Sequence, residues 1–172
     1  MTAAAPDFIE PFEAWRVWRV VRAGGAFRLG SVVQHTLWPT NSELSADCHR
    51  MRLFRRRRHE APDMDCECGI YAAATLEQLR LYVVEGLRGQ LSRVVGRVAL
   101  WGTVVECERG FRASRAYPAR LYVPADTGAQ WQVSATEVAL GLCAYGVPVE
   151  PAEVPAAQLP DVLVTTALRQ AR

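Results

Sequence analysis

The chain has 172 residues, which fits one domain (1–172) large enough to bury a core of its own. Half of the residues are hydrophobic, 22% are charged and the formal net charge is only +2, so composition indicates a globular protein and charge alone indicates neither a nucleic acid nor a membrane as partner. All twenty basic residues are arginine, and the lack of lysine excludes Schiff-base enzymes that use a lysine and P-loop proteins.

The N-terminal part of the chain predicts a flexible arm followed by a β-hairpin. Residues 1–11 are small, acidic and proline-flanked, so we expect them to pack poorly. Residues 14–22 are rich in aromatic and β-branched side chains, and Gly24 and Gly25 suit a tight turn. We therefore predict a second strand from Ala26 to about Thr36.

The cellular compartment is predicted from the same end of the chain. The first residues lack the basic and apolar regions of a secretory leader, and no run approaches eighteen apolar residues. We expect a cytoplasmic protein with no membrane partner. In that compartment, five cysteines are predicted to be reduced thiols or metal ligands.

A cluster of potential metal ligands follows the hairpin, and we treat residues 46–71 as a metal-binding insertion. Cys48, His59, Cys66 and Cys68 have the spacing C-x10-H-x6-C-x-C. Three thiolates and one imidazole form a ligand set that closes the tetrahedral shell of a structural zinc ion. Neighbouring acidic residues make a polar context, which disfavours the alternative of three ordinary buried cysteines.

Two further alternatives for the cluster remain open. The same four residues match the ligands of an iron-sulfur cluster such as [2Fe-2S], and the protein would then be a redox protein or another metalloenzyme. His49 is a substitute ligand if His59 points away. The C-x-C pair is also narrower than the usual pair of a zinc finger, so spacing does not identify the metal.

Between the first two ligands lies an arginine-rich segment. Six arginines fall between Arg50 and Arg58, with Met51 and Phe54 among them. This pattern predicts contacts with the phosphates and bases of a nucleic acid. The alternative is a solvated loop whose charge is balanced by acidic residues downstream. The residues predicted to bind nucleic acid are Arg52, Arg55, Arg56, Arg57 and Arg58.

The remaining elements alternate between helix and strand. A capping box at Thr75 and Gln78 predicts a helix over about 72–85. Residues 94–105 are apolar on both alternating faces, which predicts a central buried strand with bends at Gly96 and Gly102. A turn at 106–110 leads to a returning strand that we expect Pro118 to end, and 119–123 form a further short strand.

The C-terminal third contains a second capping box. Ser134 and Glu137 open an apolar segment that predicts a helix over 135–145, and residues 161–171 are a weaker helix candidate. The five tryptophans are expected to fill the β core, although an aromatic-lined ligand pocket is an alternative. Cys107 and Cys143 have no histidine nearby in sequence that could act together with a carboxylate, so we predict no catalytic residue.

Two blocks of the sequence resemble a pattern found in uncharacterised small, arginine-rich proteins of actinomycete bacteria. The blocks are CHRMRLFRRRRHEAPDMDCECGIYA, at 48–72, and GRVALWGTVVECERGFRASRAYPARLYV, at 96–123. The likeness spans most of residues 14–147 and implies that both blocks belong to one domain. It implies no activity, ligand or fold.

The sequence predicts an α+β fold. Its core is β-rich, either a small barrel or a curved antiparallel sheet, with two to three helices and a metal-bound loop. The predicted function is that of a binding or regulatory module in which structural zinc holds the arginine-rich loop, with a nucleic acid or a protein as partner. An iron-sulfur or other redox metalloenzyme is the alternative.

Overall fold

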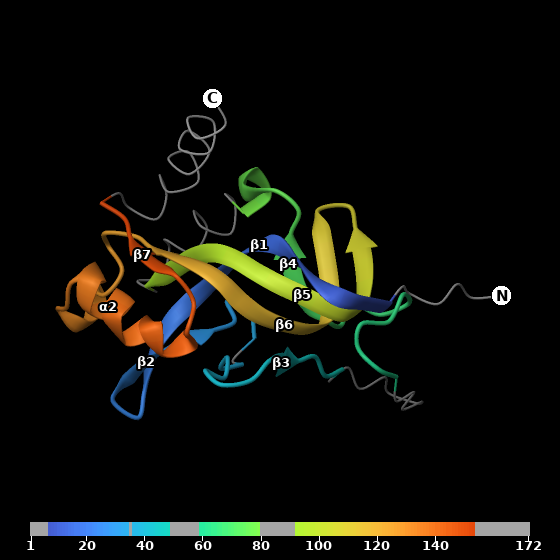
Figure 1. Ribbon diagram of the computed structural model, residues 1–172, viewed down its shortest axis with the longest axis horizontal. Helices are drawn as coiled ribbons and strands as arrows, with labels where there is room; N and C mark the ends of the chain where they lie inside the picture. Colours follow the sequence, from blue (N-terminus) through green and yellow to red (C-terminus); the bar gives the residue numbers. More distant parts are fainter. Residues whose placement is uncertain (1–6, 35, 49–58, 80–91, 154–172) are drawn as a thin grey trace.

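The computed structural model describes residues 7–34, 36–48, 59–79 and 92–153. Within this part of the chain, seven strands form one sheet and the helical segments are short (Figure 1). The elements are β1 (Asp7–Ala23), β2 (Ala26–Gly30), β3 (Leu44–Ser45), β4 (Ile70–Ala73), β5 (Arg93–Cys107), β6 (Gly110–Val123), η2 (Ala129–Trp131), α2 (Ala135–Leu142), η3 (Cys143–Tyr145) and β7 (Val149–Pro151). Residues 76–79 are also helical, and the helix predicted at 161–171 lies outside the described residues.

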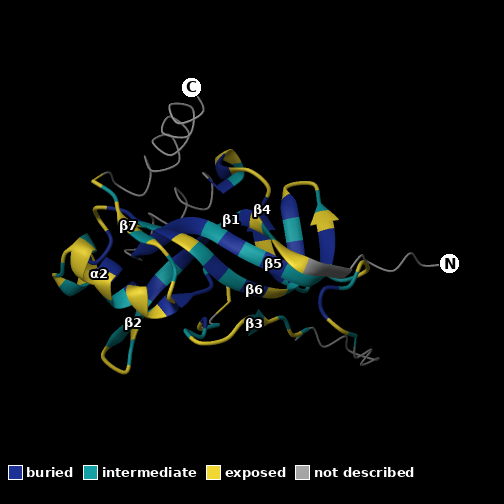
Figure 2. Cartoon of the chain, viewed as in Figure 1, coloured by how far each residue is buried: buried dark blue, intermediate teal, exposed yellow. Residues whose placement is uncertain are grey.

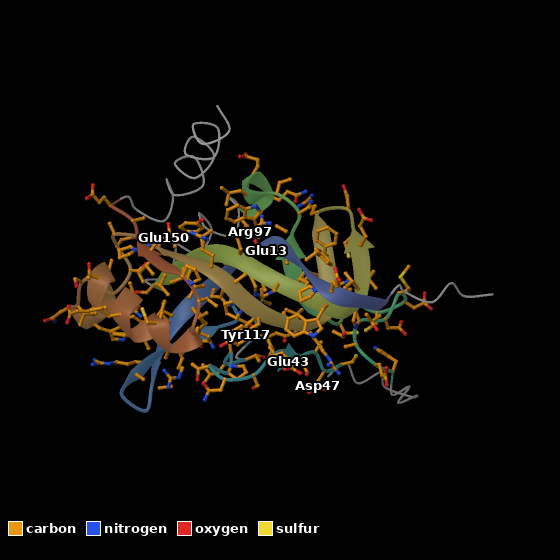
Figure 3. All side chains as sticks on the ribbon, in the orientation of Figure 1. Glu13, Glu43, Asp47, Arg97, Tyr117 and Glu150 are labelled. Carbon is orange, nitrogen blue, oxygen red and sulfur yellow. The ribbon has the colours of Figure 1, made fainter. Side chains whose placement is uncertain are left out.

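Three long antiparallel strands form the centre of the sheet. β5 lies between β1 and β6, as expected for a strand that is apolar on both faces. Buried residues follow these strands, whereas exposed residues gather on loops and on the outer side of α2 (Figure 2). At one exposed position Arg97 of β5 lies beside Glu13 of β1, with 3.1 Å between Nε and Oε2 (Figure 3). The predicted central strand is therefore confirmed.

The N-terminal hairpin forms, with different limits from those predicted. Gly24 and Gly25 make its turn with φ angles of 59° and 80°, which glycine adopts without steric cost. β1 begins at Asp7, inside the region expected to be an arm. β2 ends at Gly30 because the chain turns there, and the backbone N–H of Ser31 donates to Thr36 across that turn.

The sheet curves until its two ends touch. β1 pairs with β5, β5 with β6 and β6 with β4, and β4 returns to β1 through one register pair, Trp15 opposite Ala73. A barrel requires continuous ladders between all neighbouring strands. Among the described residues the sheet thus closes through a single register pair, so the barrel alternative of the predicted fold is not confirmed.

The core lies inside this curve and is closed at one end by α2. Trp18 and Trp38 are both buried and meet edge to face, with ring centroids 5.6 Å apart. The hydroxyl of Tyr145 accepts a hydrogen bond from the Leu29 N–H at 2.8 Å and donates to the Trp38 carbonyl at 2.9 Å. The capping box of Ser134 and Glu137 opens α2 as predicted.

Two predicted limits were wrong. Pro118 does not end a strand, because β6 continues through it to Val123. Pro118 pairs with Val98 at a register irregularity of the β5–β6 ladder, where Ala119 of β6 is the extra residue, so the ladder is already interrupted and the missing N–H is tolerated. The helix predicted from residue 72 begins at Leu76, since Ala72 and Ala73 belong to β4.

The predicted capping box of this helix does form. The Thr75 N–H donates to the Gln78 side chain at 3.1 Å, and the Gln78 N–H donates to the Thr75 hydroxyl at 3.4 Å. With α2, it makes two α-helical segments in the described ranges, at the low end of the two to three predicted.

Candidate metal centre

One edge of β6 brings distant parts of the chain together. β3 pairs with Arg115 and Ala116 of β6, and the Ala46 N–H then donates to the Ser114 carbonyl at 2.8 Å. The chain leaves the sheet after this bond and returns as β4, whose Ile70 lies opposite Ala113. Its departure and its return therefore lie at neighbouring positions of one strand, and this places Cys48 near residues 59–69, which we call the ligand loop.

The four predicted ligands meet at this place. One ligand atom from each of Cys48, His59, Cys66 and Cys68 lies within 4.8 Å of all the others, and each residue is half-buried. The Cys48 and Cys66 sulfurs are 3.7 Å apart, and His59 Nε2 is 3.3 Å from the Cys68 sulfur. The group lies at the end of the sheet opposite α2 (Figure 1).

These distances match the edges of a tetrahedron around one ion. With zinc–sulfur bonds of about 2.3 Å and zinc–nitrogen bonds of about 2.0 Å, two sulfurs are about 3.8 Å apart and a sulfur and a nitrogen about 3.5 Å apart. The Cys3His group is thus close enough to hold a metal ion.

Local backbone geometry shapes the ligand loop. Asp63 opens a turn in which its carboxylate accepts from the Asp65 N–H at 2.8 Å and its carbonyl accepts from the Cys66 N–H at 3.2 Å. Gly69 has a φ of 120°, and a Cβ there would lie 3.0 Å from the Pro62 side chain. Glycine adopts this positive φ without the steric cost that a side chain would impose.

Arg112 holds the ligand loop from the sheet side. This residue of β6 is buried, and its Nη1 donates to the carbonyl oxygens of Asp63 at 3.3 Å, of Cys68 at 3.0 Å and of Cys66 at a shorter distance. Its Nε donates to the Cys107 sulfur at 3.3 Å. A single guanidinium therefore satisfies three carbonyls of the loop that carries two of the thiols.

The thiols differ in acidity because of their hydrogen bonds. Burial opposes ionisation of Cys66, but the backbone amide of Cys68 and hydrogen bonds from Cys48, Cys68 and His59 lower its pKa to about 7. Burial raises the pKa of Cys68 to about 11, with help from the hydrogen bond and the negative charge of Cys66. Cys66 is thus the more acidic of these two thiols and ionises first to the thiolate, the form that binds metals.

The other residues singled out by sequence have separate positions. Cys107 accepts from Arg112 without joining the ligand group, and Cys143 is exposed after α2, where its thiol donates to the Ala139 carbonyl at 3.4 Å. Trp18 and Trp38 fill the core, as expected, whereas Trp15, Trp101 and Trp131 are only half-buried. Residues 49–58, with His49 and the five arginines predicted to bind nucleic acid, and also His35, lie outside the described residues.

Sequence reasoning missed Arg112. Its alternation with Phe111 and Ala113 placed it on the polar face of a strand, which is usually solvated. The ligand loop covers that face, so Arg112 is buried. The sequence feature that could have indicated its burial was an arginine between two apolar residues of a strand.

Neither the helices of the structure nor comparisons with known proteins add to what the geometry of the Cys3His group indicates. In the part of the chain that the structure describes, no helix has the length and hydrophobicity needed to cross a bilayer. No family model matches the chain, and no curated protein or solved structure matches it either.

Proposed function

We propose that the protein binds one structural zinc ion through Cys48, His59, Cys66 and Cys68 and acts as a binding or regulatory module. The observation that carries this proposal is the mutual approach of the four ligand atoms to within 4.8 Å. Three sulfurs and one nitrogen complete a four-coordinate shell and leave no open position for a substrate, which is typical of a structural site. The role of the ion is then to stabilise the structure and not to take part in a reaction.

The ion would fasten the arginine-rich segment to the sheet. Cys48 and His59 immediately flank residues 49–58, so metal binding joins the two ends of that segment. Closing such a loop costs chain entropy, and metal coordination offsets that cost. Arg112 supports the same structure by holding the carbonyls of the ligand loop.

Metal content is the direct test. The full-length protein, purified without chelators, should contain one zinc ion per chain by elemental analysis. Replacement of zinc by Co²⁺ should give the visible absorption of a tetrahedral thiolate site, since geometry and ligand type determine that spectrum. Cys68→Ser should lose the ion, whereas Cys143→Ser, the same substitution at a thiol outside the site, should retain it.

Two outcomes would contradict the zinc assignment. Stoichiometric iron together with a coloured protein would indicate the iron-containing alternative. Equal metal content in the Cys68→Ser and Cys143→Ser proteins would show that the ion is bound elsewhere.

We further propose that residues 49–58 contact a nucleic acid. Support comes from the six arginines in this segment and from the two ligands that would hold its ends together. Counterion release makes such binding weaken with salt. The double variant Arg57→Ala/Arg58→Ala should lower the slope of log K against log salt by about 1 to 2 for a single-stranded oligonucleotide.

A matched control removes the same charge from the sheet. Arg115→Ala/Arg120→Ala takes away two exposed arginines of β6 and should leave the salt slope unchanged. Equal effects of the two double variants, or no binding by the parent chain, would remove the nucleic acid and leave a protein as the partner class.

A further inference from the structure

A groove lies where the sheet closes on itself. Its volume is about 680 Å³, a size common among sites for small organic molecules. β1, β3 and β4 form its walls together with the turn between β5 and β6. Apolar side chains among the described lining residues include Val17, Leu44, Ile70, Leu79 and Phe111. The groove contains none of the four metal ligands.

Arg16 lines this groove and has only neutral partners. Its Nη1 donates to the Tyr71 carbonyl, and its Nη2 donates to the Ser31 hydroxyl at 3.4 Å. Its guanidinium carbon lies 4.9 Å from the centre of the Trp38 ring. Its Nε is buried and has no acceptor, and no carboxylate of the described residues forms an ion pair with Arg16.

Arg16 is a half-buried cation with a fully buried Nε and no counter-ion among the described residues, which favours an anionic guest. Burial lowers the pKa of Arg16 to about 10, so the side chain remains charged at neutral pH. A buried charge is costly unless an opposite charge pairs with it. A carboxylate matches the planar donors of a guanidinium and would also supply an acceptor in this region.

We infer that this groove binds a small organic monocarboxylate with a flat apolar body, whose carboxylate pairs with Arg16. Apolar walls and the aromatic side chains of Trp15, Tyr71 and Phe111 in the lining suit such a body. Asp47 and Glu67 also line the groove, and Figure 3 shows Asp47 just beyond β3. Arg109 also lines the groove and offsets one of these two negative charges. The remaining negative charge disfavours a dianion such as a phosphate monoester, so one negative charge is the best complement to Arg16.

A purely structural role for Arg16 is the competing explanation. Its hydrogen bonds join β1 to β4 and to the turn after β2, close to the single pair of Trp15 and Ala73. In that case the guanidinium would be satisfied by these contacts, and the charge of a guest would not affect its affinity.

A pair of isosteric probes separates these explanations. The full-length, metal-loaded protein is titrated with 2-naphthoate and with the neutral 2-naphthalenemethanol, and the Nε–H resonances of its arginines are followed by NMR. We expect the naphthoate to shift the Arg16 resonance and to bind at least about tenfold more tightly than the alcohol, as a charge-assisted hydrogen bond predicts. Phenyl phosphate, as the dianion, should bind more weakly than the naphthoate.

Variants locate the effect. Arg16→Met should bring the affinity for naphthoate down to that for the alcohol, whereas Arg120→Met, an equal change of charge at an exposed site paired with Glu150, should leave both affinities unchanged. Equal affinities of the two probes for the parent chain, or no binding of either, would overturn the inference even if Arg16→Met does not fold. Zinc content is measured separately, so failure here and failure of the metal site are distinguishable.

Discussion

Arg112 contacts the ligand loop, and its Nη1 donates to the Cys68 carbonyl oxygen at 3.0 Å. The residue belongs to β6, where Arg112 pairs with Tyr71 of β4 and with Val105 of β5. A strand that is fixed on both sides therefore presents the donor to the loop. The positions of two thiols thus depend on a side chain that is not a ligand.

Removing this donor should weaken metal binding. Arg112→Gln leaves the carbonyls of the ligand loop without their shared partner, and loss of such an outer contact typically lowers metal affinity by about 10- to 100-fold. Competition with a chromophoric chelator measures the change. Arg115→Gln, an exposed neighbour on the same strand, should keep the parent affinity. Equal affinities of the two variants would show that Arg112 does not position the ligands.

Metal removal should lower thermal stability. At a free metal concentration of about 1,000 times Kd, binding to the folded state alone contributes about 4 kcal/mol. For a chain of this size, each kcal/mol corresponds to roughly 2–4 °C in Tm, so a chelator should lower Tm by about 8–16 °C. Scanning calorimetry of the parent protein and of Cys143→Ser should show this difference. A chelator should not change the Tm of Cys68→Ser, and a drop of equal size there would point to another ion.

A methyl group at Gly69 should cost more than one in the hairpin turn. Gly69 has a φ of 120°, and a Cβ would lie 3.0 Å from the Pro62 side chain and 3.1 Å from that of Arg112. Gly69→Ala should lower the free energy of unfolding by about 1–3 kcal/mol. Gly24→Ala, with a φ of 59° and open space around it, should cost about 1 kcal/mol. Urea denaturation compares them, and equal losses would contradict the described approach of the three residues.

The cap of α2 predicts a dependence on pH. Hydrogen bonds from the backbone N–H and the hydroxyl of Ser134 lower the pKa of Glu137. Because the folded pKa is depressed, the ionised carboxylate stabilises the protein above its unfolded pKa, and this stability is lost as pH falls through the folded value. Ser134→Ala should raise the pKa of Glu137 towards its ordinary value in an NMR titration. Thr136→Ala, in the same turn, should not, and equal shifts would contradict the cap.

Features set by local sequence were predictable. The capping boxes at Ser134 and at Thr75 place polar side chains three residues apart, where the backbone of a first turn needs them. β5 was recognisable because both of its faces are apolar. The ligand set was also predicted, since the residue types themselves limit the chemistry.

Features set by distant neighbours were not predictable. Arg112 is buried only because a loop about fifty residues earlier in the chain covers it. Pro118 remains in a strand because the β5–β6 ladder is irregular beside it, and Ala72 is in a strand because β6 offers an edge for pairing. The groove at Arg16 forms between strands whose closure depends on one pair of residues. Hydrophobic period and propensity contain no information on such contacts.

β3 and β4 pair with neighbouring positions of β6, so the sheet does not depend on the segment that joins them, residues 47–69. The Ala46 N–H donates a hydrogen bond to the Ser114 carbonyl, and Ile70 lies opposite Ala113. Residues 47–69 therefore begin and end beside adjacent residues of β6. A short turn joining those two anchors would preserve every strand pairing of the sheet. We therefore expect the sheet to fold with other loops, of different length or charge, in place of residues 47–69.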